Sequence, residues 1–553
     1  MNDITNSCAK ELPILTVKDL TISLPARADR PYAVENVSFE LFPGEILCIV
    51  GESGSGKSMS SNAVMGLLPK PHVNVSHGEI LFEGLDLAAI DNKAMQSIRG
   101  EKIGMIFQEP MTALNPVMKV SKQLEEVFRS HHLKLSRTQI QQKIIEMLDD
   151  VGLPDPKIIG NSYPFELSGG QRQRVMIAMA LALEPTILIA DEPTTALDVT
   201  TQAQILKLIA DLQKKRNMGV IFITHDFGVV AEIADRVIVM QLGQIVEQGN
   251  ADDLLNRPTH PYTRKLIATV PHLGAVKKVA ISSDVVVSVK GLNKTYGSAK
   301  KSWFGKAGRV VHASKDINFD IRKGETLGLV GESGSGKSTV GRCIIRLHES
   351  DSGAVEFQGQ DILKLSNSEM MDIRQHIQMI FQDPYASLNP RRKIGDIITE
   401  GPTIHGVPKA QSWKKAEELL EIVGLDSYAL KRYPHEFSGG QRQRIGIARA
   451  LAMSPKLLIA DEAVSALDVS VQAQVLELLD DIKHKMDLAM LFVTHDLRVA
   501  AQVCDNIVVM KLGEVVEYGP TYDVFHNPQH EYTKSLLDAV PGKEWKVPKL
   551  DIS

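Results

Sequence analysis

Short apolar runs alternate with longer segments of helical periodicity along the chain. Buried strands read as continuous runs of Val, Ile and Leu, whereas amphipathic helices place apolar residues three or four positions apart. Strands that alternate with helices predict an α/β core with a largely parallel sheet. The strand-like runs lie at 14–17, 46–50, 186–190, 220–224, 285–289 and 327–330, and helical patterns lie at 140–151, 202–214 and 413–423.

This pattern occurs twice in the chain. The octapeptide Gly-Glu-Ser-Gly-Ser-Gly-Lys-Ser is found at 51–58 and again at 331–338, and Ser-Gly-Gly-Gln-Arg-Gln-Arg is found at 168–174 and 438–444. A solenoid repeat has a period of only tens of residues, so the duplicated unit is a whole domain. We expect a first domain at 13–273, a linker at 274–284, a second domain at 285–543 and a tail at 544–553.

Composition excludes several classes of protein. The chain has 553 residues, of which 43% are hydrophobic, and its net charge of −5 provides no general basic surface for nucleic acid. No run approaches the roughly 18 apolar residues of a membrane-spanning helix, and the first ten residues do not resemble a secretory signal. The four cysteines form no Cys-x-x-Cys pair, so we expect a reduced, cytosolic protein.

Each octapeptide fits the phosphate-binding pattern G-x-x-x-x-G-K-[ST]. Its glycines let backbone N–H groups surround the phosphates, its lysine reaches the β and γ oxygens, and its serine coordinates Mg²⁺. A glycine-rich turn without a ligand is disfavoured, because both copies follow an apolar strand. The predicted ATP-binding residues are Gly51, Ser53, Gly54, Gly56, Lys57, Ser58 and Met59, and Gly331, Ser333, Gly334, Gly336, Lys337, Ser338 and Thr339.

A carboxylate pair ends a later strand in each half. Asp191 and Asp461 can hold Mg²⁺, and Glu192 and Glu462 follow where a general base could polarise the attacking water. Such a pair alone is more often a helix N-cap or a solvated loop. Its fixed order and spacing behind a phosphate loop favour the catalytic interpretation.

The segments Leu-Ser-Gly-Gly-Gln at 167–171 and Phe-Ser-Gly-Gly-Gln at 437–441 resemble the signature of the ABC (ATP-binding cassette) ATPases. A plain serine N-cap followed by flexible glycines is the alternative. The resemblance implies a RecA-like core, a helical signature subdomain and an antiparallel β subdomain in each half. It also implies two composite sites, in which each signature closes over the ATP held by the other half's lysine. The signature residues assigned to ATP are Ser168, Gly169, Gly170, Ser438, Gly439 and Gly440.

The resemblance extends to other positions in both halves. His225 and His495 match the histidine that contacts the γ-phosphate, and 196–198 and 466–468 match the loop that links the two sites. Neither half has lost its lysine, glutamate, serine or histidine, so both sites are expected to hydrolyse ATP. Together with the glutamines that sense Mg²⁺, the implied metal residues are Ser58, Gln108, Asp191, Ser338, Gln382 and Asp461.

The adenine contact differs between the halves. Tyr296 matches the aromatic residue that stacks on adenine in this family. In the first half Leu24 holds the analogous place, and Tyr32 is a weak substitute. The sequence therefore leaves the adenine-stacking residue of the first half open.

The segments at 256–263 and 527–533 resemble the C-terminal extension of the oligopeptide/dipeptide/nickel importer ATPases, although a capped surface helix is the alternative. The resemblance implies an ATP-hydrolysing, energy-coupling subunit with ATP and Mg²⁺ as cofactors. It would dock on two integral membrane permease subunits at the cytoplasmic face of the bacterial inner membrane, and act indirectly with a solute-binding protein. The implied cargo is a peptide or a glutathione-like compound. Two alternatives are a soluble tandem ATPase acting on ribosomes or nucleic acid, which the short linker and negative charge disfavour, and an exporter, which commonly carries its own spanning helices.

Prolines follow Gln108 and Gln382 closely, and they predict stiff, non-helical surface loops. Met111, Leu114 and Tyr385 are apolar residues on these loops, as a surface that docks a membrane partner would require. The alternative is that they pack the loop onto its own domain.

Overall fold

The computed structural model describes residues 12–26, 28–108, 113–131, 135–195, 197–275, 282–297, 310–465, 467–548 and 550. The chain forms two compact units. The first contains Met1–Leu197, Thr201–Val270 and Pro541–Ser553, and the second contains Asp198–Thr200 and Pro271–Val540. Most of the predicted linker, at 276–281, lies outside the described residues. The predicted domain boundaries therefore stay predictions.

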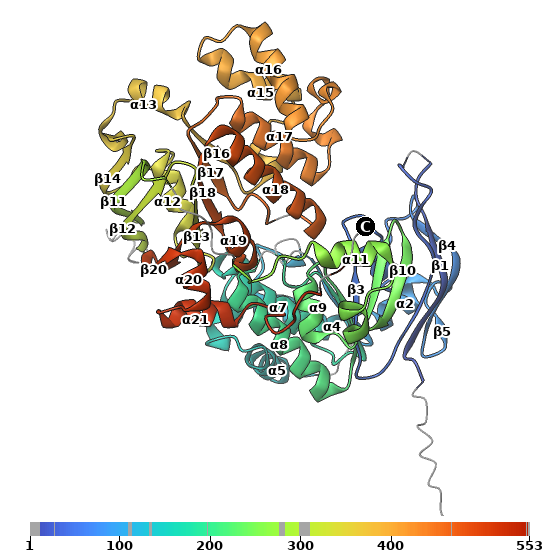
Figure 1. The fold of residues 1–553 in the computed structure, drawn as a ribbon. Helices are drawn as coiled ribbons and strands as arrows, with labels where there is room; N and C mark the ends of the chain where they lie inside the picture. The colour runs from blue at the N-terminus through green and yellow to red at the C-terminus, as the bar shows by residue number, and fades with distance from the viewer. Residues whose placement is uncertain are drawn as a thin grey trace, which may run out of the picture. The chain divides into compact units, whose positions relative to one another are not determined.

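A six-stranded sheet forms the centre of the first unit (Figure 1). Its strands are β3 (Ile46–Val50), β6 (Ile103–Ile106), β7 (Ile187–Asp191), β8 (Gly219–Ile223), β9 (Arg236–Gln241) and β10 (Gln244–Asn250). The order is β10-β9-β3-β8-β7-β6, and every neighbouring pair is parallel except β9 and β10. The inner strands β3, β7 and β8 are buried along their whole length, as strands inside a parallel sheet are. The predicted parallel core is confirmed.

A four-stranded antiparallel sheet packs beside this core. It consists of β1 (Leu15–Ser23), β2 (Tyr32–Leu41), β4 (Asn74–Phe82) and β5 (Leu85–Asp86), in the order β2-β1-β4-β5. Side chains alternate between buried and exposed along β2, as expected for a sheet with one covered face. Val17 and Val37 share one hydrophobic cluster with Ile49 and Ile189 of the central sheet, so the two sheets share a core.

The helices of the first half form two groups. Those outside the helical insert are α1 (Lys57–Val64), α2 (Asn92–Ile98), α8 (Val199–Arg216), α9 (Phe227–Ile233), α10 (Ala251–Asn256) and α11 (Pro261–Ala268). The helical insert lies between β6 and β7 in the chain, and Ser136 begins one of its helices with a reciprocal capping box to Gln139. The insert contains α4 (Val120–Ser130), α5 (Arg137–Asp150), α6 (Pro156–Asn161), the 3₁₀ turn η1 (Pro164–Glu166) and α7 (Gly169–Ala180).

The second unit repeats both sheets. Its central sheet has the order β16-β17-β18-β13-β19-β20, with β19 and β20 as the antiparallel pair, and its second sheet has the order β12-β11-β14-β15. When this order is followed from β20 to β16, each central strand corresponds to the strand at the same position in the order β10-β9-β3-β8-β7-β6 of the first unit. The strands are β11 (Val285–Tyr296), β12 (Val311–Arg322), β13 (Thr326–Val330), β14 (Ser352–Phe357), β15 (Gln360–Asp361), β16 (Ile377–Ile380), β17 (Leu457–Asp461), β18 (Ala489–Thr494), β19 (Asn506–Lys511) and β20 (Glu514–Pro520).

The helices of the second half follow the same plan. In the part of the chain that the structure describes, no helix is long and apolar enough to cross a membrane. The helical elements are α12 (Lys337–Ile344), η2 (Ile362–Lys364), α13 (Asn367–Arg374), α14 (Pro384–Ser387), α15 (Ile394–Ile404), α16 (Lys409–Ile422), η3 (Ser427–Lys431), η4 (Pro434–Glu436), α17 (Gly439–Leu451), α18 (Val469–Met486), α19 (Leu497–Val503), α20 (Thr521–His526) and α21 (Glu531–Asp538).

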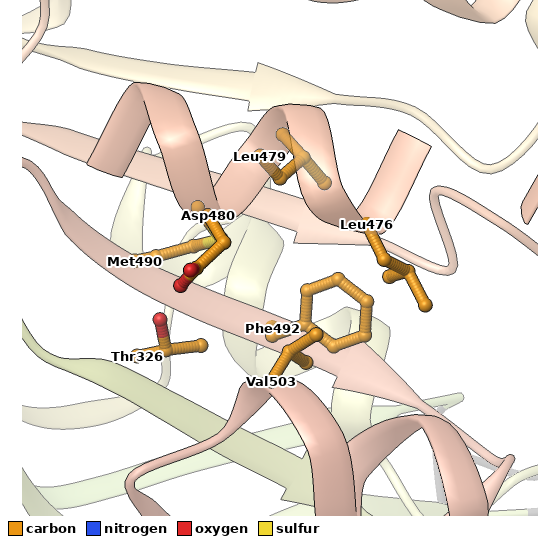
Figure 2. Close-up of a pocket in the computed structure, with 7 residues that line it drawn as sticks. All are labelled: Thr326, Leu476, Leu479, Asp480, Met490, Phe492 and Val503. Carbon is orange, nitrogen blue, oxygen red and sulfur yellow. The ribbon is translucent and has the colours of Figure 1, made fainter. Parts of the chain in front are cut away.

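A small pocket in the second unit lies between α18, α19 and the central sheet (Figure 2). It is lined at one side by Thr326, the first residue of β13, and its other walls include Leu476, Leu479 and Phe492 of the hydrophobic core. Ligands of open parallel sheets bind beyond the carboxyl ends of the strands, whereas Thr326 is at the amino end of β13. We therefore interpret this pocket as a packing gap of the core.

Candidate active sites

Each glycine loop connects a buried strand to a helix. In the first unit the loop follows β3, and α1 begins at Lys57 directly after Gly56. The Nζ of Lys57 donates hydrogen bonds to the carbonyl oxygens of Gly51 at 2.7 Å and Glu52 at 2.9 Å. Lys337 makes the corresponding bonds at 2.8 and 2.9 Å. A buried ammonium group inside a loop at a helix N-terminus suits an anionic ligand such as a phosphate.

The glycine directly before the lysine of each loop has no room for a side chain. Gly56 and Gly336 have φ angles of 102° and 104°, in the left-handed region that favours glycine. A Cβ on Gly56 would lie 2.8 Å from the carbonyl oxygen of Ala33, and one on Gly336 would lie 1.9 Å from that of Ala313. The close approach of β2 and β12 therefore fixes both the shape of the loops and the identity of these residues.

A serine and an aspartate meet beside each lysine. The Oγ of Ser58 donates to Oδ1 of Asp191 at 2.9 Å, and the Oγ of Ser338 donates to Oδ1 of Asp461 at 2.7 Å. Burial raises the pKa of both aspartates, against the lowering effect of the serine hydrogen bonds. Hydroxyl and carboxylate oxygens at the edge of a phosphate loop are suitable ligands for a small divalent cation such as Mg²⁺.

The two aspartates differ in one neighbour. The Oδ2 of Asp461 is buried and accepts no hydrogen bond from the residues that the structure describes, which fits a position for a metal ligand. An Nη2 atom of Arg342 lies 3.7 Å from this oxygen. The equivalent helix position in the first half, five residues after the lysine, is the uncharged Asn62.

A glutamate and a histidine face each other in both halves. The Nδ1 of His225 lies 3.4 Å from Oε1 of Glu192, and His495 and Glu462 are separated by the same distance. Burial alone would raise the pKa of Glu192, but the hydrogen bond and charge of His225, with the charge of Lys57, lower it to about 2. Burial would likewise lower the pKa of His225, yet Glu192 raises it above its usual value. The carboxylate is therefore ionised, as a general base must be.

Both glutamates have an unusual backbone conformation. Glu192 has φ 45° and Glu462 has φ 48°, in the left-handed region that residues other than glycine seldom adopt. The N–H of Glu192 donates to the carbonyl oxygen of Ile223 in β8 at 3.0 Å, and that of Glu462 donates to Val493 at 2.9 Å. Strain of this kind persists where the surrounding structure enforces it, and it is common at active sites.

The predicted glutamines lie in the same clusters. The Nε2 of Gln108 donates to Oε2 of Glu192 at 3.0 Å, and the Nε2 of Gln382 donates to Oε2 of Glu462 at 2.6 Å. In each half the structure thus brings lysine, serine, aspartate, glutamate, glutamine and histidine together at the carboxyl ends of the central strands. Direct coordination of a metal by the glutamines stays a prediction.

The signature serines begin helices. Ser168 caps α7, and its Oγ accepts a hydrogen bond from the N–H of Gln171 at 3.3 Å while Gln171 Oε1 accepts from the N–H of Ser168 at 3.0 Å. Ser438 and Gln441 form the same capping box at the start of α17. The serine N-cap interpretation therefore describes the local structure. Contact of these serines with a nucleotide stays a prediction.

Tyr296 and Leu24 occupy equivalent positions with different surroundings. Each lies four residues after a buried leucine that pairs with the neighbouring strand, Leu292 in β11 or Leu20 in β1. The ring of Tyr296 is 37% exposed, whereas Leu24 packs against the hydrophobic core of the first unit. Tyr32, the suggested substitute, is 37% exposed at the start of β2.

Two tyrosines in the C-terminal segments contact the glycine loops, and sequence reasoning did not assign them. The hydroxyl oxygen of Tyr262, in α11, accepts a hydrogen bond from the N–H of Glu52 at 3.3 Å. The hydroxyl of Tyr532, in α21, accepts one from Glu332 at 3.2 Å. Their signal in the sequence was the Tyr-Thr pair that both C-terminal segments share. These segments are therefore part of the site's framework.

The proline-containing loops differ in part from the prediction. Leu114 is only 2% exposed, so its side chain belongs to the core and the prediction of an exposed docking residue was wrong. The second loop is not wholly irregular, because Asp383 caps the short helix α14 through the N–H groups of Tyr385 and Ala386. Tyr385 is 63% exposed and has the guanidinium carbon of Arg442 3.9 Å from its ring centre. Met111 lies outside the described residues.

Comparison with known proteins identifies the class. Residues 34–195 and 314–465 match the family "ABC transporter", and residues 246–293 and 516–550 match "Oligopeptide/dipeptide transporter, C-terminal region". A solved structure of the ATP-binding cassette MJ0796, a dimer in a post-hydrolysis state bound to ADP and phosphate, is 30% identical. The match covers 43% of this chain and 98% of that chain at a TM-score of 0.39. The chain belongs to the ABC transporter ATP-binding proteins, and it is an ATPase with two fused cassettes.

Particular relatives carry a more specific name. The glutathione import ATP-binding protein GsiA of Salmonella choleraesuis (strain SC-B67) is 48% identical over 559 residues, which is 96% of this chain and 89% of that protein. GsiA of Escherichia coli (strain K12) is also 48% identical, over 562 residues, 96% of this chain and 90% of that protein.

Proposed function

We propose that this chain is the energy-coupling ATPase of a binding-protein-dependent importer whose cargo is a peptide or a glutathione-like compound. The observation that carries this proposal is the C-terminal segment of each half. Both segments match the oligopeptide/dipeptide transporter region, and both place a tyrosine hydroxyl on the glycine loop. The two relatives named GsiA, which match 96% of this chain, are glutathione import ATP-binding proteins and support the same cargo class.

The site residues act on ATP as their geometry suggests. Lys57 and the backbone N–H groups at the start of α1 bind the β and γ phosphates, and Lys337 with α12 does the same in the second half. Ser58, Asp191 and Gln108 would hold Mg²⁺, which would act as a Lewis acid and polarise the phosphate oxygens. Ser338, Asp461 and Gln382 are their counterparts.

Hydrolysis depends on the glutamates. Glu192, ionised at neutral pH, accepts a proton from the attacking water, and His225 keeps the carboxylate oriented through its Nδ1. Glu462 and His495 repeat this arrangement. The Glu192 carboxylate raises the pKa of His225 and so favours its charged form, which would stabilise the charge that develops on the γ-phosphate.

The proposal includes composite sites, as the family resemblance implies. Ser168, Gly169 and Gly170 would complete the ATP site of Lys337, and Ser438, Gly439 and Gly440 that of Lys57. The presence of both signatures and both glycine loops in one chain supports an intramolecular pairing. Cross-linking of cysteines introduced at Ser168 and Ser333, only in the presence of ATP, would support this pairing.

The partners are two integral permease subunits, with the chain peripheral at the cytoplasmic face of the inner membrane. A tagged full-length chain, purified from detergent-solubilised membranes, should bring down integral subunits in defined stoichiometry. Its ATPase activity in that complex should rise when a binding protein loaded with glutathione or a small peptide is added. Recovery with ribosomes, and no stimulation by any loaded binding protein, would contradict the proposal.

A further inference from the structure

The two halves have different residue types at two equivalent positions near the glycine loops. In the second half, exposed Tyr296 ends β11, and Val310 lies three residues before Ala313, the residue that touches Gly336. In the first half, the tyrosine position is Leu24, which packs against the hydrophobic core, and the position three residues before Ala33 is Arg30. The first half therefore lacks the aromatic ring of Tyr296, and it has a guanidinium group at the second position, where the second half has Val310.

Arg30 reaches the glycine loop of the first half. An Nη2 atom of Arg30 donates to the carbonyl oxygen of Gly54, within the loop, and lies 3.5 Å from the carbonyl oxygen of Ala33. A Cβ built on Gly54 would meet nothing within 4 Å, so the loop is open to a ligand at this point. The guanidinium therefore lies at the mouth of the phosphate loop.

Local backbone structure keeps Arg30 in this place. Leu24 N–H donates to the carbonyl oxygen of Pro31 at 2.8 Å and closes the hairpin between β1 and β2. Pro31 disfavours the helical backbone conformation for the preceding residue, Arg30. Among the residues that the structure describes, no acidic side chain pairs with Arg30, although a half-buried cation beside a loop normally finds one.

We propose that Arg30 is the adenine-contacting residue of the first ATP site, where its planar guanidinium stacks on the base as the ring of Tyr296 does in the second site. Arginine stacks on flat aromatic systems through its planar guanidinium, so it can replace a tyrosine here. This inference rests on the proposed ATP sites. It makes the two sites chemically different, one with an arginine and one with a tyrosine on the base.

The test uses the full-length chain with one site disabled at a time. Lys337→Ala leaves the first site to bind nucleotide, and Lys57→Ala leaves the second. In the Lys337→Ala background, Arg30→Ala should weaken ATP binding about tenfold, as expected for loss of one stacked base contact. Arg30→Lys should lose most of this affinity too, because an ammonium group does not stack. In the Lys57→Ala background, Arg30→Ala should have no effect and Tyr296→Ala should weaken binding by a similar factor.

Tripolyphosphate separates a base contact from a phosphate contact. Its binding to the Lys337→Ala protein should be unchanged by Arg30→Ala, because tripolyphosphate has no base. An equal loss for ATP and tripolyphosphate would overturn the stacking assignment, as would unchanged ATP binding. The proposed ATP sites themselves fail in a different way: the Lys57→Ala and Lys337→Ala double variant would then still bind ATP at the parental affinity.

Discussion

The hydroxyl oxygen of Tyr262 accepts a hydrogen bond from the backbone N–H of Glu52, 210 residues earlier in the chain, at 3.3 Å. Tyr532 and Glu332 are joined in the same way across 200 residues. Both tyrosines are largely buried, at 9% and 7% exposure. The C-terminal segment of each half is thus hydrogen-bonded to the glycine loop of the same half.

Removing this hydrogen bond should weaken ATP binding without unfolding the protein. Tyr262→Phe together with Tyr532→Phe removes the hydroxyl that accepts a hydrogen bond from each loop. Each lost hydrogen bond costs about 1 kcal/mol of interaction free energy. We expect the KM for ATP to rise about fivefold while kcat changes little, because the reacting groups remain in place. Steady-state ATPase kinetics measure this. Tyr522→Phe, an exposed tyrosine on α20, is the matched control, and a KM equal to that of the parent would show that the bond does not position the loop.

The second prediction concerns Glu192 and Glu462, which we propose as the general bases. Glu192→Gln with Glu462→Gln keeps the size of both side chains but removes their ability to accept a proton. ATP hydrolysis should fall by about 10²–10⁴-fold, while ATP binding is kept. Radiolabelled ATP retained after rapid filtration and phosphate release measure the two quantities. Glu531→Gln, at an exposed glutamate, is the control, and hydrolysis at the parental rate in the double variant would reject both assignments.

Some of this site could be predicted from the sequence and some could not. Lys57, Ser58, Asp191 and Glu192 were assigned because local motifs place them at the ends of strands, and the fold brings such ends together. The hydrogen bond between Tyr262 and Glu52 could not be predicted, because a contact between residues 210 positions apart depends on how α11 packs. Local patterns carry no information on such packing.

The sequence also did not predict correctly which loop side chains are buried. Leu114 stands between polar residues and prolines, which predicted exposure, yet it is 2% exposed because it packs into the core. The positive φ of Glu192 also has no signal in the sequence, since a glutamate rarely adopts it without tertiary constraints. The strands were easier to predict: the run at 46–50 coincides with β3, because a strand buried on both faces is apolar throughout.

The third prediction concerns pH and Glu325 in the second unit. This residue is 0% exposed, and burial raises its pKa above the ordinary 4.5, against the hydrogen bonds from Asn506 and Arg322. The folded state therefore binds the proton more tightly than the unfolded state. Its contribution to stability is greatest below pH 4.5 and is lost as the pH rises through the raised pKa.

Glu325→Gln removes this titration. The difference in unfolding free energy between parent and variant should move in favour of the parent as the pH falls from neutral towards 4.5. Urea unfolding at a series of pH values measures it. A difference that is constant with pH, or that moves in the opposite direction, would show that Glu325 has no raised pKa in the folded protein.

The last prediction concerns coupling to a membrane partner. Tyr385 lies on α14, close in sequence to Gln382, whose amide donates to Glu462, the proposed general base, at 2.6 Å. Its ring is 63% exposed, with Arg442 of the signature helix against it, so it is accessible to a partner and close to residues at the ATP site. Tyr385→Asp should abolish stimulation of ATPase activity by the loaded binding protein in the assembled transporter, because a carboxylate does not enter an apolar contact. The isolated chain should keep its basal activity within about twofold, as surface substitutions usually do. Tyr428→Asp, a tyrosine 66% exposed on η3, is the matched control. Loss of basal activity together with a lowered Tm would show that Tyr385 stabilises its own domain through Arg442, and the docking assignment would then be wrong.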